Sequence, residues 1–387
     1  MRNKNFKQLS MPATREQVSL IAVDRAISEL RRGRFVSIKG AGGIAILMQA
    51  AEAITPESLL KILEFSQSNP VLAVTARRAA VLGLADTTGK IVTISVKGEI
   101  TTDIIYDLSN PLSKISMSKS NLDSLNITTR KNPMYDCQSA AVALTKIARL
   151  LPAAVTAEIV DSTAEDLAAW SARHDLLLVD AGDVFQYDNT QARTLRIVSS
   201  ARVPLINSEN TKIIAFRPID GGLEHLAIVI GNPEKHLPVL TRLHSECFTG
   251  DLLGSLRCDC GDQLQGAMQE IATVGSGVLI YLAQEGRGIG LVNKLRAYEL
   301  QDHGFDTMDA NEQLGFDADE RVYIPAAKIL RLLGFEKVRL MTNNPDKVEG
   351  LSNCGIIIKE RVKHTFPSNE HNETYLRTKV TKGGHIF

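Results

Sequence analysis

The sequence has no excess of charge of either sign, because 44 lysines and arginines face 44 aspartates and glutamates in 387 residues. Without net positive charge the chain has no bulk field to attract nucleic acid or an anionic membrane, so an anionic ligand would need a local cation cluster. It also lacks any run of 18 apolar residues, and its first residues, MRNKNFKQLS, are polar. These absences argue against a membrane span and a secretion signal, and we expect a cytoplasmic protein.

Cysteine is also scarce, with five residues in the chain. Cytoplasmic thiols stay reduced, so these cysteines are better interpreted as metal ligands, catalysts or core residues than as disulfides. Three of them, Cys247, Cys258 and Cys260, fall within 14 residues in a C-x10-C-x-C pattern. Three thiolates leave one tetrahedral position of a zinc ion open, as in catalytic sites, where bound water becomes a nucleophile. The alternatives are a structural zinc site closed by a ligand such as His244, and buried cysteines without metal.

The length suits two domains, each large enough to bury a core without disulfides. Hydrophobic residues make up 44% and charged residues 23%, which is typical of a soluble globular protein. Helical and strand-like segments alternate, so we predict a mixed α/β fold in two domains, residues 1–195 and 196–387. The polar stretch from Asp188 to Asn210 is interpreted as the linker, and Gly221-Gly222 as the turn of a hairpin.

A glycine-rich run, QEGRGIGL, joins a predicted strand to a predicted helix. Free backbone amides at such a turn can bind an anion, and Arg287 can form charge-assisted hydrogen bonds to it. The alternative is that the glycines serve only the turn. Farther along the helix, Lys294 and Arg296 are expected on a solvated face.

Two later segments carry polar residues suited to an active site. In NEQLGFDADER, Asp319 and Arg321 are two residues apart, so in an extended segment their side chains point the same way. The carboxylate could accept a proton and the guanidinium could hold a phosphate. In TNNPDK, Thr342 ends a predicted strand and Lys347 lies in the first turn of a helix. A surface turn rich in acids and a helix-capping segment are the simpler interpretations of these two runs.

Taken together, these segments resemble GTP cyclohydrolase II from about Ser200 to Phe387. The resemblance rests on motifs that occur in order: RLHSEC, LRCDCG, QEGRGIGL, AYELQD, NEQLGFDADER, MTNNPDK, and a closing YLRTK with a late Gly-His. It implies zinc-dependent hydrolysis of GTP at C8 of guanine, the first step of riboflavin biosynthesis. The implied products are formate, pyrophosphate and 2,5-diamino-6-ribosylamino-pyrimidinone 5'-phosphate. A homodimer and Mg²⁺ bridging the triphosphate oxygens are implied as well.

The resemblance also implies roles for single residues. Cys247, Cys258 and Cys260 become the zinc ligands, Asp319 the proton acceptor, and Tyr298 a hydrogen-bond or proton donor beside the opening ring. Arg321 is either a nucleophile on the α-phosphate or, because guanidinium stays protonated, an electrostatic stabiliser of the leaving pyrophosphate. The implied GTP contacts, of which Arg242, Arg287 and Lys347 suit phosphates, are Arg242, Leu243, His244, Ser245, Glu246, Gln263, Glu285, Gly286, Arg287, Thr307, Thr342 and Lys347.

The first half resembles dihydroxybutanone phosphate synthase in the segments AISELRRGRFVSIK and AAEAITPESL. That family implies an acid-rich loop directly after the strand, to bind Mg²⁺ and a sugar phosphate, and an Arg-Pro-Gly-His motif. Here no carboxylate lies between Lys39 and Gln49, although divalent metals need hard oxygen ligands, and residues 126–134 read NITTRKNPM. We predict a preserved fold that is inactive as a synthase, with dimerisation, stabilisation or regulation as its role. A bifunctional enzyme and a non-catalytic GTP-binding regulatory protein are the competing hypotheses.

Overall fold

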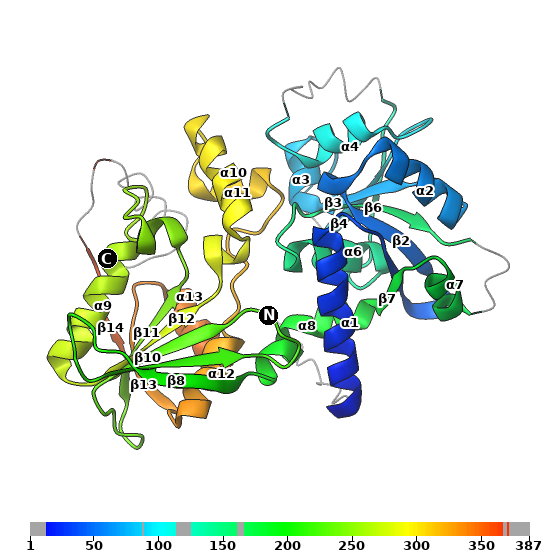
Figure 1. Cartoon of the computed structure of the whole chain (residues 1–387). Coiled ribbons are helices and arrows are strands. Elements are labelled where there is room, and N and C mark those ends of the chain that lie inside the picture. The colour runs from blue at the N-terminus through cyan, green and yellow to red at the C-terminus, as the bar shows by residue number, and fades with distance from the viewer. Residues whose placement is uncertain (1–12, 87–88, 114–124, 161–165, 367–369, 371–387) are drawn as a thin grey trace, which may run out of the picture.

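The structure, a computed structural model, describes residues 13–86, 89–113, 125–160, 166–366 and 370. Within this part of the chain it contains two seven-stranded sheets, one in each half, with helices packed against them (Figure 1). The predicted mixed α/β class is confirmed. The YLRTK motif and the late Gly-His lie outside the described residues. No helix in the described ranges is both long enough and apolar enough to span a bilayer.

The first sheet has the strand order β5-β4-β3-β6-β2-β1-β7. Its neighbours pair antiparallel except for the parallel edge pair β1 and β7. Strand β2 is buried along its whole length, as its apolar run AILMQA requires of a central strand. The strands are β1 (Val36–Lys39), β2 (Ala45–Ala50), β3 (Val71–Thr75), β4 (Ile91–Ser95), β5 (Thr128–Lys131), β6 (Ala153–Glu158) and β7 (Leu177–Asp180).

Helices of the first half begin where the sequence supplies caps. The Thr55 side chain accepts a hydrogen bond from the Ser58 amide, and the Ser58 side chain accepts one from the Thr55 amide. Pro56 occupies the first turn of α2. Small residues such as Ala140 and Ala141 let α6 pack closely into the core beneath the sheet. The helices are α1 (Ala13–Arg31), α2 (Pro56–Ser66), α3 (Ala76–Val81), α4 (Thr102–Ser109), α6 (Cys137–Ile147), α7 (Leu167–Arg173) and α8 (Ala181–Arg193).

The second sheet has the order β14-β13-β11-β12-β10-β9-β8. The predicted hairpin is confirmed, because β9 and β10 pair antiparallel on either side of Gly221-Gly222. Strands β11, β12, β13 and β14 run parallel, so their carboxyl ends meet at one edge, where α/β proteins commonly bind ligands. The strands are β8 (Arg196–Arg202), β9 (Thr211–Arg217), β10 (His225–Ile230), β11 (Val239–Ser245), β12 (Gly277–Leu282), β13 (Lys337–Met341) and β14 (Ile357–Val362).

Five α-helices accompany the second sheet in the described residues. Pro345 and the Asn344 cap, which accepts from the Asp346 amide, start α13 where the TNNPDK run places them. The helices are α9 (Cys260–Val274), α10 (Leu291–Asp302), α11 (Thr307–Gln313), α12 (Ile324–Leu333) and α13 (Pro345–Asn353).

The predicted linker from Asp188 to Asn210 is wrong. Helix α8 continues to Arg193, and β8 begins only three residues later at Arg196. Tyr187 and Thr190 are buried on one face of α8, so the segment is an amphipathic helix despite its many polar residues. All seven residues of β8 are exposed at a sheet edge, which explains why their sequence has no apolar periodicity.

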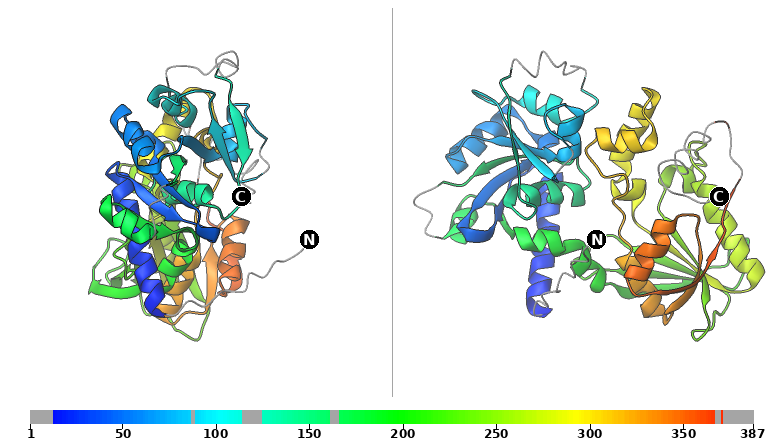
Figure 2. Two further views of the ribbon diagram at one scale, coloured as in Figure 1. Left: turned by 90° about the vertical axis from the view of Figure 1, so that its right-hand side faces the viewer. Right: turned by 180° about the vertical axis from the view of Figure 1, so that it is seen from behind.

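The two halves touch through α10 and α11, which stand between the sheets (Figure 2). Leu151, at the start of the turn into β6, is buried in one apolar cluster with Ile289, Leu300 and Phe316 of the second half. Asn293 of α10 also donates a 3.0 Å hydrogen bond to the carbonyl of Arg149. The first half therefore packs directly against the segments that surround the carboxyl ends of β11 and β12.

Candidate active site

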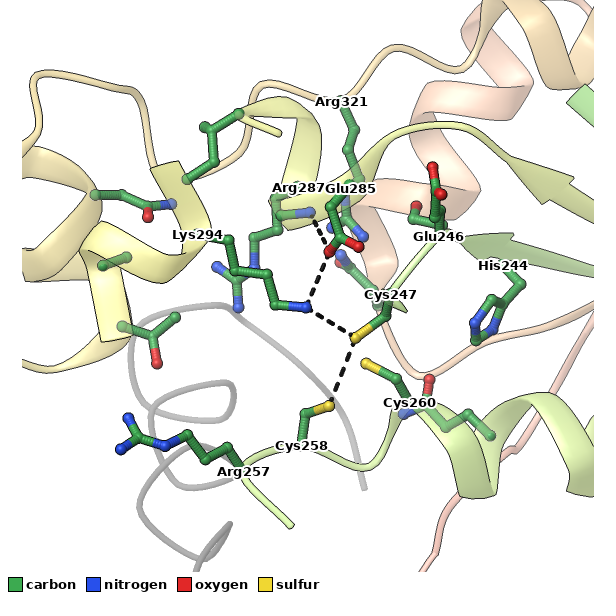
Figure 3. Close-up of a pocket in the computed structure, with 18 of the residues that line it drawn as sticks. His244, Glu246, Cys247, Arg257, Cys258, Cys260, Glu285, Arg287, Lys294 and Arg321 are labelled. Carbon is green, nitrogen blue, oxygen red and sulfur yellow. Dashed lines mark hydrogen bonds and ion pairs between the residues drawn. The ribbon is translucent and has the colours of Figure 1, made fainter. Parts of the chain in front are cut away.

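A pocket opens at the carboxyl edge of the parallel strands in the second sheet (Figure 3). Ser245 ends β11, Glu285 follows β12, and Thr342 follows β13, and all three line the pocket. Helices α9, α10, α11 and α13 contribute the remaining walls. The parallel topology thus brings together segments that are about a hundred residues apart in the chain.

The three clustered cysteines converge in this pocket (Figure 3). Their sulfur atoms all lie within 4.8 Å of one another, and those of Cys247 and Cys258 are 3.7 Å apart, too far for a disulfide. Gly250 crosses directly above them: an added Cβ there would lie 2.9 Å from the Cys258 sulfur and 3.0 Å from that of Cys247. A glycine is therefore required where the short π-helix Phe248–Leu252 closes over the cluster.

Three soft donors at this spacing fit a tetrahedral zinc ion with one position left for another ligand. His244, the proposed fourth ligand of a structural site, is not part of the cluster, and its Nε2 contacts Asp251 Oδ1 at 2.9 Å instead. Hydrogen bonds from Cys258 and Cys260, together with Lys294, hold the pKa of the Cys247 thiol well below its usual range. Three protein ligands without a fourth among the described residues therefore suit a catalytic zinc site, which keeps one position open, better than a structural site with four protein ligands.

Lys294 is buried beside the cluster, so the expectation that it lies on a solvated helix face is wrong. Its ammonium lies 3.1 Å from Cys247 Sγ and 2.9 Å from Glu285 Oε1 (Figure 3). It also lies 2.9 Å from Thr249 Oγ1. Burial favours the neutral amine, but the hydrogen bond to Glu285 and the charge of Cys247 outweigh it and raise the pKa of Lys294. The cation thus joins the cysteine cluster to the loop that follows β12.

That loop turns through a left-handed backbone at two successive residues, Gly286 with φ of 63° and Arg287 with φ of 60°. Positive φ is costly for arginine, and such strain is retained where the surrounding contacts fix it, commonly at functional sites. The Glu285 carboxylate accepts hydrogen bonds from the amides of Phe248 (2.6 Å) and Gly286 (2.9 Å), which fixes the turn. Arg287 is thereby directed to the pocket wall.

Asp319 and Arg321 form an ion pair at the edge of the pocket, which confirms that their side chains point the same way. Arg321 Nε lies 2.8 Å and 3.1 Å from the two carboxylate oxygens. Burial opposes ionisation of Asp319, but the hydrogen bonds and charge of Arg321 outweigh it and hold the pKa of that carboxyl below its usual value. Arg321 lines the pocket and Asp319 lies behind it.

Buried cations, and buried nitrogen atoms without a partner among the described residues, gather at β11 and the start of α13. Arg242 donates to the Met341 carbonyl at 2.9 Å and to Gln263 Oε1 at 2.5 Å, while Lys347 donates to the Leu243 carbonyl at 3.0 Å. Burial lowers the pKa of Arg242 to about 10, which still leaves it charged at neutral pH. Within the described residues, Arg242 Nε and His244 Nδ1 are buried without a hydrogen-bond partner. A ligand oxygen could accept from Arg242 Nε, whereas His244 Nδ1 calls for a donor, because the ring contacts the Asp251 carboxylate through Nε2.

Comparisons with known proteins agree with this site. Residues 196–363 match the family model for GTP cyclohydrolase II. The chain is 53% identical over 372 residues to GTP cyclohydrolase-2 of Azospirillum brasilense, covering 96% of this chain and 95% of that protein. The chain belongs to the GTP cyclohydrolase II family.

Two further matches span nearly the whole chain. The riboflavin biosynthesis protein RibBA of Parabacteroides distasonis is 35% identical to this chain over 405 residues, covering 96% of this chain and 98% of that protein. The crystal structure of RibBX, a two-domain 3,4-dihydroxy-2-butanone 4-phosphate synthase from A. baumannii, aligns with 89% of this chain and 99% of its own. Its TM-score is 0.36 and its sequence identity 17%.

The structure of this GTP cyclohydrolase II gathers nearly all of the residues named from the sequence. Leu243 packs its side chain into the core and offers only its carbonyl, since neighbouring strand residues face opposite sides. Apart from Leu243 and Asp319, the pocket is lined by Arg242, His244, Ser245, Glu246, Cys247, Cys258, Cys260, Gln263, Glu285, Gly286, Arg287, Tyr298, Thr307, Arg321, Thr342 and Lys347.

Several lining residues of the cyclohydrolase pocket escaped the sequence interpretation. His364, beyond β14, is buried and contacts the Gln263 carbonyl through Nε2 at 3.0 Å. Nothing in its local sequence marks it. Asn343 and Asn344 stand inside the TNNPDK run, where they were interpreted only as capping residues. Arg257, directly before Cys258, lies 5.0 Å from the ring centre of Tyr298, a contact between residues far apart in sequence.

Proposed function

We propose that this enzyme hydrolyses GTP to 2,5-diamino-6-ribosylamino-pyrimidinone 5'-phosphate, formate and pyrophosphate, using one zinc ion per chain. The observation that carries the proposal is the convergence of three free thiols in a pocket whose other walls hold buried cations. A nucleotide triphosphate supplies the anionic end that those cations need, and the purine supplies a carbon that water can attack. Membership of the GTP cyclohydrolase II family supports the same substrate.

Cys247, Cys258 and Cys260 would hold the zinc ion. Bound there with an open position, Zn²⁺ supplies an activated water for attack on carbon, here C8 of guanine. The role of the chain is to orient the ligands: Lys294 and Thr249 fix the Cys247 side chain, and Asp251 accepts a hydrogen bond from the Cys247 amide at 3.0 Å. Such outer contacts set ligand direction and basicity.

The remaining residues have catalytic or GTP-binding roles in this proposal. Asp319 serves as proton acceptor, and Tyr298, whose side chain lies beside the cysteines, donates a hydrogen bond or a proton to the opening ring. Arg242, Arg287 and Lys347 bind the triphosphate, and Mg²⁺ would neutralise part of its charge. Arg321 stabilises the charge that develops on the leaving pyrophosphate. Leu243, His244, Ser245, Glu246, Gln263, Glu285, Gly286, Thr307 and Thr342 complete the GTP contacts.

The first half contributes no synthase activity in this proposal. The segment that should supply carboxylates for Mg²⁺ forms an exposed turn, Ala41–Gly43, followed by the buried apolar strand β2. No acidic side chain is present from Gly40 to Gln49 to act as a hard ligand. We further propose that the enzyme is cytoplasmic and forms a homodimer. Light scattering of the purified chain would check the dimer.

One assay separates the competing functions. The purified full chain is incubated with Mg²⁺ and either GTP or ribulose 5-phosphate, and formate and pyrophosphate are followed. We expect formate and pyrophosphate from GTP and no formate from ribulose 5-phosphate. Formate from both substrates would identify a bifunctional enzyme, and GTP binding by calorimetry without turnover would identify a regulatory protein.

A further inference from the structure

Two cations of the first half bind the loop that carries Asp319 and Arg321. Lys146, in the last turn of α6, lies 2.6 Å from Glu320 Oε1, and Arg77, in α3, lies 2.6 Å from Asp317 Oδ1. The two acids flank Asp319 in the sequence. Arg77 also contacts Glu312 Oε1 at 2.7 Å, so it ties the end of α11 to the same loop.

The loop needs such support because residues 316–322 contain no helix or strand. The second half holds it by hydrogen bonds to backbone groups: the Glu320 amide donates to the Arg287 carbonyl at 3.1 Å, and Gln284 and Arg287 donate to the Val322 and Ala318 carbonyls at 2.8 Å and 3.3 Å. Within the loop, Glu320 Oε1 accepts from the Asp317 amide at 2.7 Å. Glu320 therefore stands where the Asp319 loop meets the Arg287 turn. A cation that binds the Glu320 carboxylate therefore restrains both the Asp319 loop and the Arg287 turn.

Hydrogen bonds from first-half side chains to backbone carbonyls fix the beginning of the loop. Thr75 Oγ1 donates to the Gly315 carbonyl at 2.7 Å, and the buried Arg78 donates to the Gln313 carbonyl at 3.1 Å. Phe316 is buried in the apolar cluster that includes Leu151. A second contact supports the turn after β12, where Arg149 donates to the Ala283 carbonyl at 2.7 Å. The first half thus contacts two loops that carry pocket residues, namely the Asp319 loop and the turn after β12.

We propose that the first half is a positioning element of the cyclohydrolase site, with Lys146 and Arg77 as positioning residues that hold Asp319 and Arg321 in place. This inference rests on the proposed roles of Asp319 and Arg321. Lys146 and Glu320 side chains are each 23% exposed, so their pair is shielded enough to fix geometry better than a fully solvated pair. Catalysis is sensitive to such geometry, since a displacement of about 1 Å can cost about a hundredfold in rate.

The test uses full-length variants Lys146→Ala, Lys146→Arg and the double variant Arg77→Ala/Lys146→Ala. Lys131→Ala is the matched control, because Lys131 forms an exposed ion pair with Asp86 inside the first half. Formate release from GTP gives kcat and KM, while zinc content and Tm report on the fold. We expect Lys146→Ala to lower kcat about tenfold and the double variant more, with KM and Tm little changed. Lys146→Arg restores most of kcat, and Lys131→Ala matches the wild type.

A kcat of the double variant within about twofold of wild type would overturn the proposal. If Lys146→Ala does not fold, the exchange Lys146→Glu/Glu320→Lys decides: recovery of kcat relative to Lys146→Glu supports positioning, and no recovery contradicts it. Hydrogen exchange of peptides covering residues 311–322 gives a readout independent of GTP chemistry. Faster exchange in Lys146→Ala supports the role even if wild-type protein releases no formate, and unchanged exchange refutes it.

Discussion

The ammonium of Lys294 lies 3.1 Å from the Sγ of Cys247, so a buried cation accompanies the thiol that begins the metal cluster. The same ammonium is 2.9 Å from Glu285, whose side chain is 4% exposed. The three groups form a chain of charges that is largely buried at the wall of the pocket. Removing the cation would leave a buried carboxylate and a buried thiolate without their partner.

We expect Lys294→Met to be destabilising by about 3 kcal/mol, because breaking one side of a buried ion pair leaves an uncompensated charge. Formate release should fall at least about tenfold, since Cys247 loses the contact that orients it. Thermal unfolding and kcat measure the two effects. Leu295→Ala, at an exposed neighbouring position on α10, is the control and should change neither. Wild-type stability in Lys294→Met would show that the buried pair contributes little.

Substitution of one thiol should remove the metal. We expect Cys258→Ser to retain less than about a tenth of the zinc of wild-type protein and to lose formate release, since a zinc site with two thiolates is incomplete. Cys354→Ser, which alters a free cysteine outside the cluster, should retain both. Zinc is quantified by plasma emission after dialysis. Full activity of a zinc-free Cys258→Ser protein would defeat the metal assignment.

The pairing of Arg321 with Asp319 predicts an electrostatic role for the guanidinium. A guanidinium that bonds a carboxylate keeps its proton and has no lone pair to attack the α-phosphate. Mass spectrometry of acid-quenched enzyme during turnover should therefore show no added guanylyl group. Arg321→Ala should lower kcat by about 10²- to 10³-fold, as for loss of one charge-stabilising group, and Arg321→Lys should lower it less. A protein-bound nucleotide on residue 321 would establish the covalent alternative.

Stability should fall in mild acid because of His225. Burial, and then the charge of Arg149, lower the pKa of His225 from 6.5 to about 4. As the pH falls, the unfolded chain binds this proton first, so stability present above pH 6.5 is lost progressively down to about pH 4. The loss attributable to His225 is about 3 kcal/mol. His364, whose pKa is also lowered to about 4, mainly by burial, adds a similar loss.

Denaturant unfolding at several pH values measures this effect. His225→Gln should show a shallower decline between pH 6.5 and 4 than the wild type, because this buried imidazole no longer titrates. The exposed His236 is the control, and His236→Gln should leave the slope unchanged. Equal slopes in all three proteins would mean that folding does not change the pKa of His225.

Local sequence patterns anticipated much of the fold. The Gly221-Gly222 turn, the proline-started helices and the apolar runs of β11 to β13 all have causes within a few residues of themselves. The prediction of a linker before β8 was wrong because the cause of the structure there is not local. The few apolar positions of this segment are buried by neighbouring elements rather than marked by an obvious period, so a helix was interpreted as a linker.

Lys294 illustrates the same limit within the site. On α10 it is one charged residue among several, and the sequence pattern favours a solvated face. Its burial depends on Glu285 and Cys247, which come from the ends of β12 and β11. His364 is a comparable case, because its place in the pocket depends on where β14 lies relative to α9. No window of sequence contains both partners of either contact.

The sequence by itself determined the spacing of Cys247, Cys258 and Cys260 and the ordered motifs around them, because ligand type and short-range spacing are local properties. Only the tertiary structure decided which charges surround that cluster and that the first half reaches the Asp319 loop. Lys146 and Glu320 are 174 residues apart in the chain and meet only because both halves fold and pack against each other. Contacts of that kind are set by burial and topology, which no local pattern records.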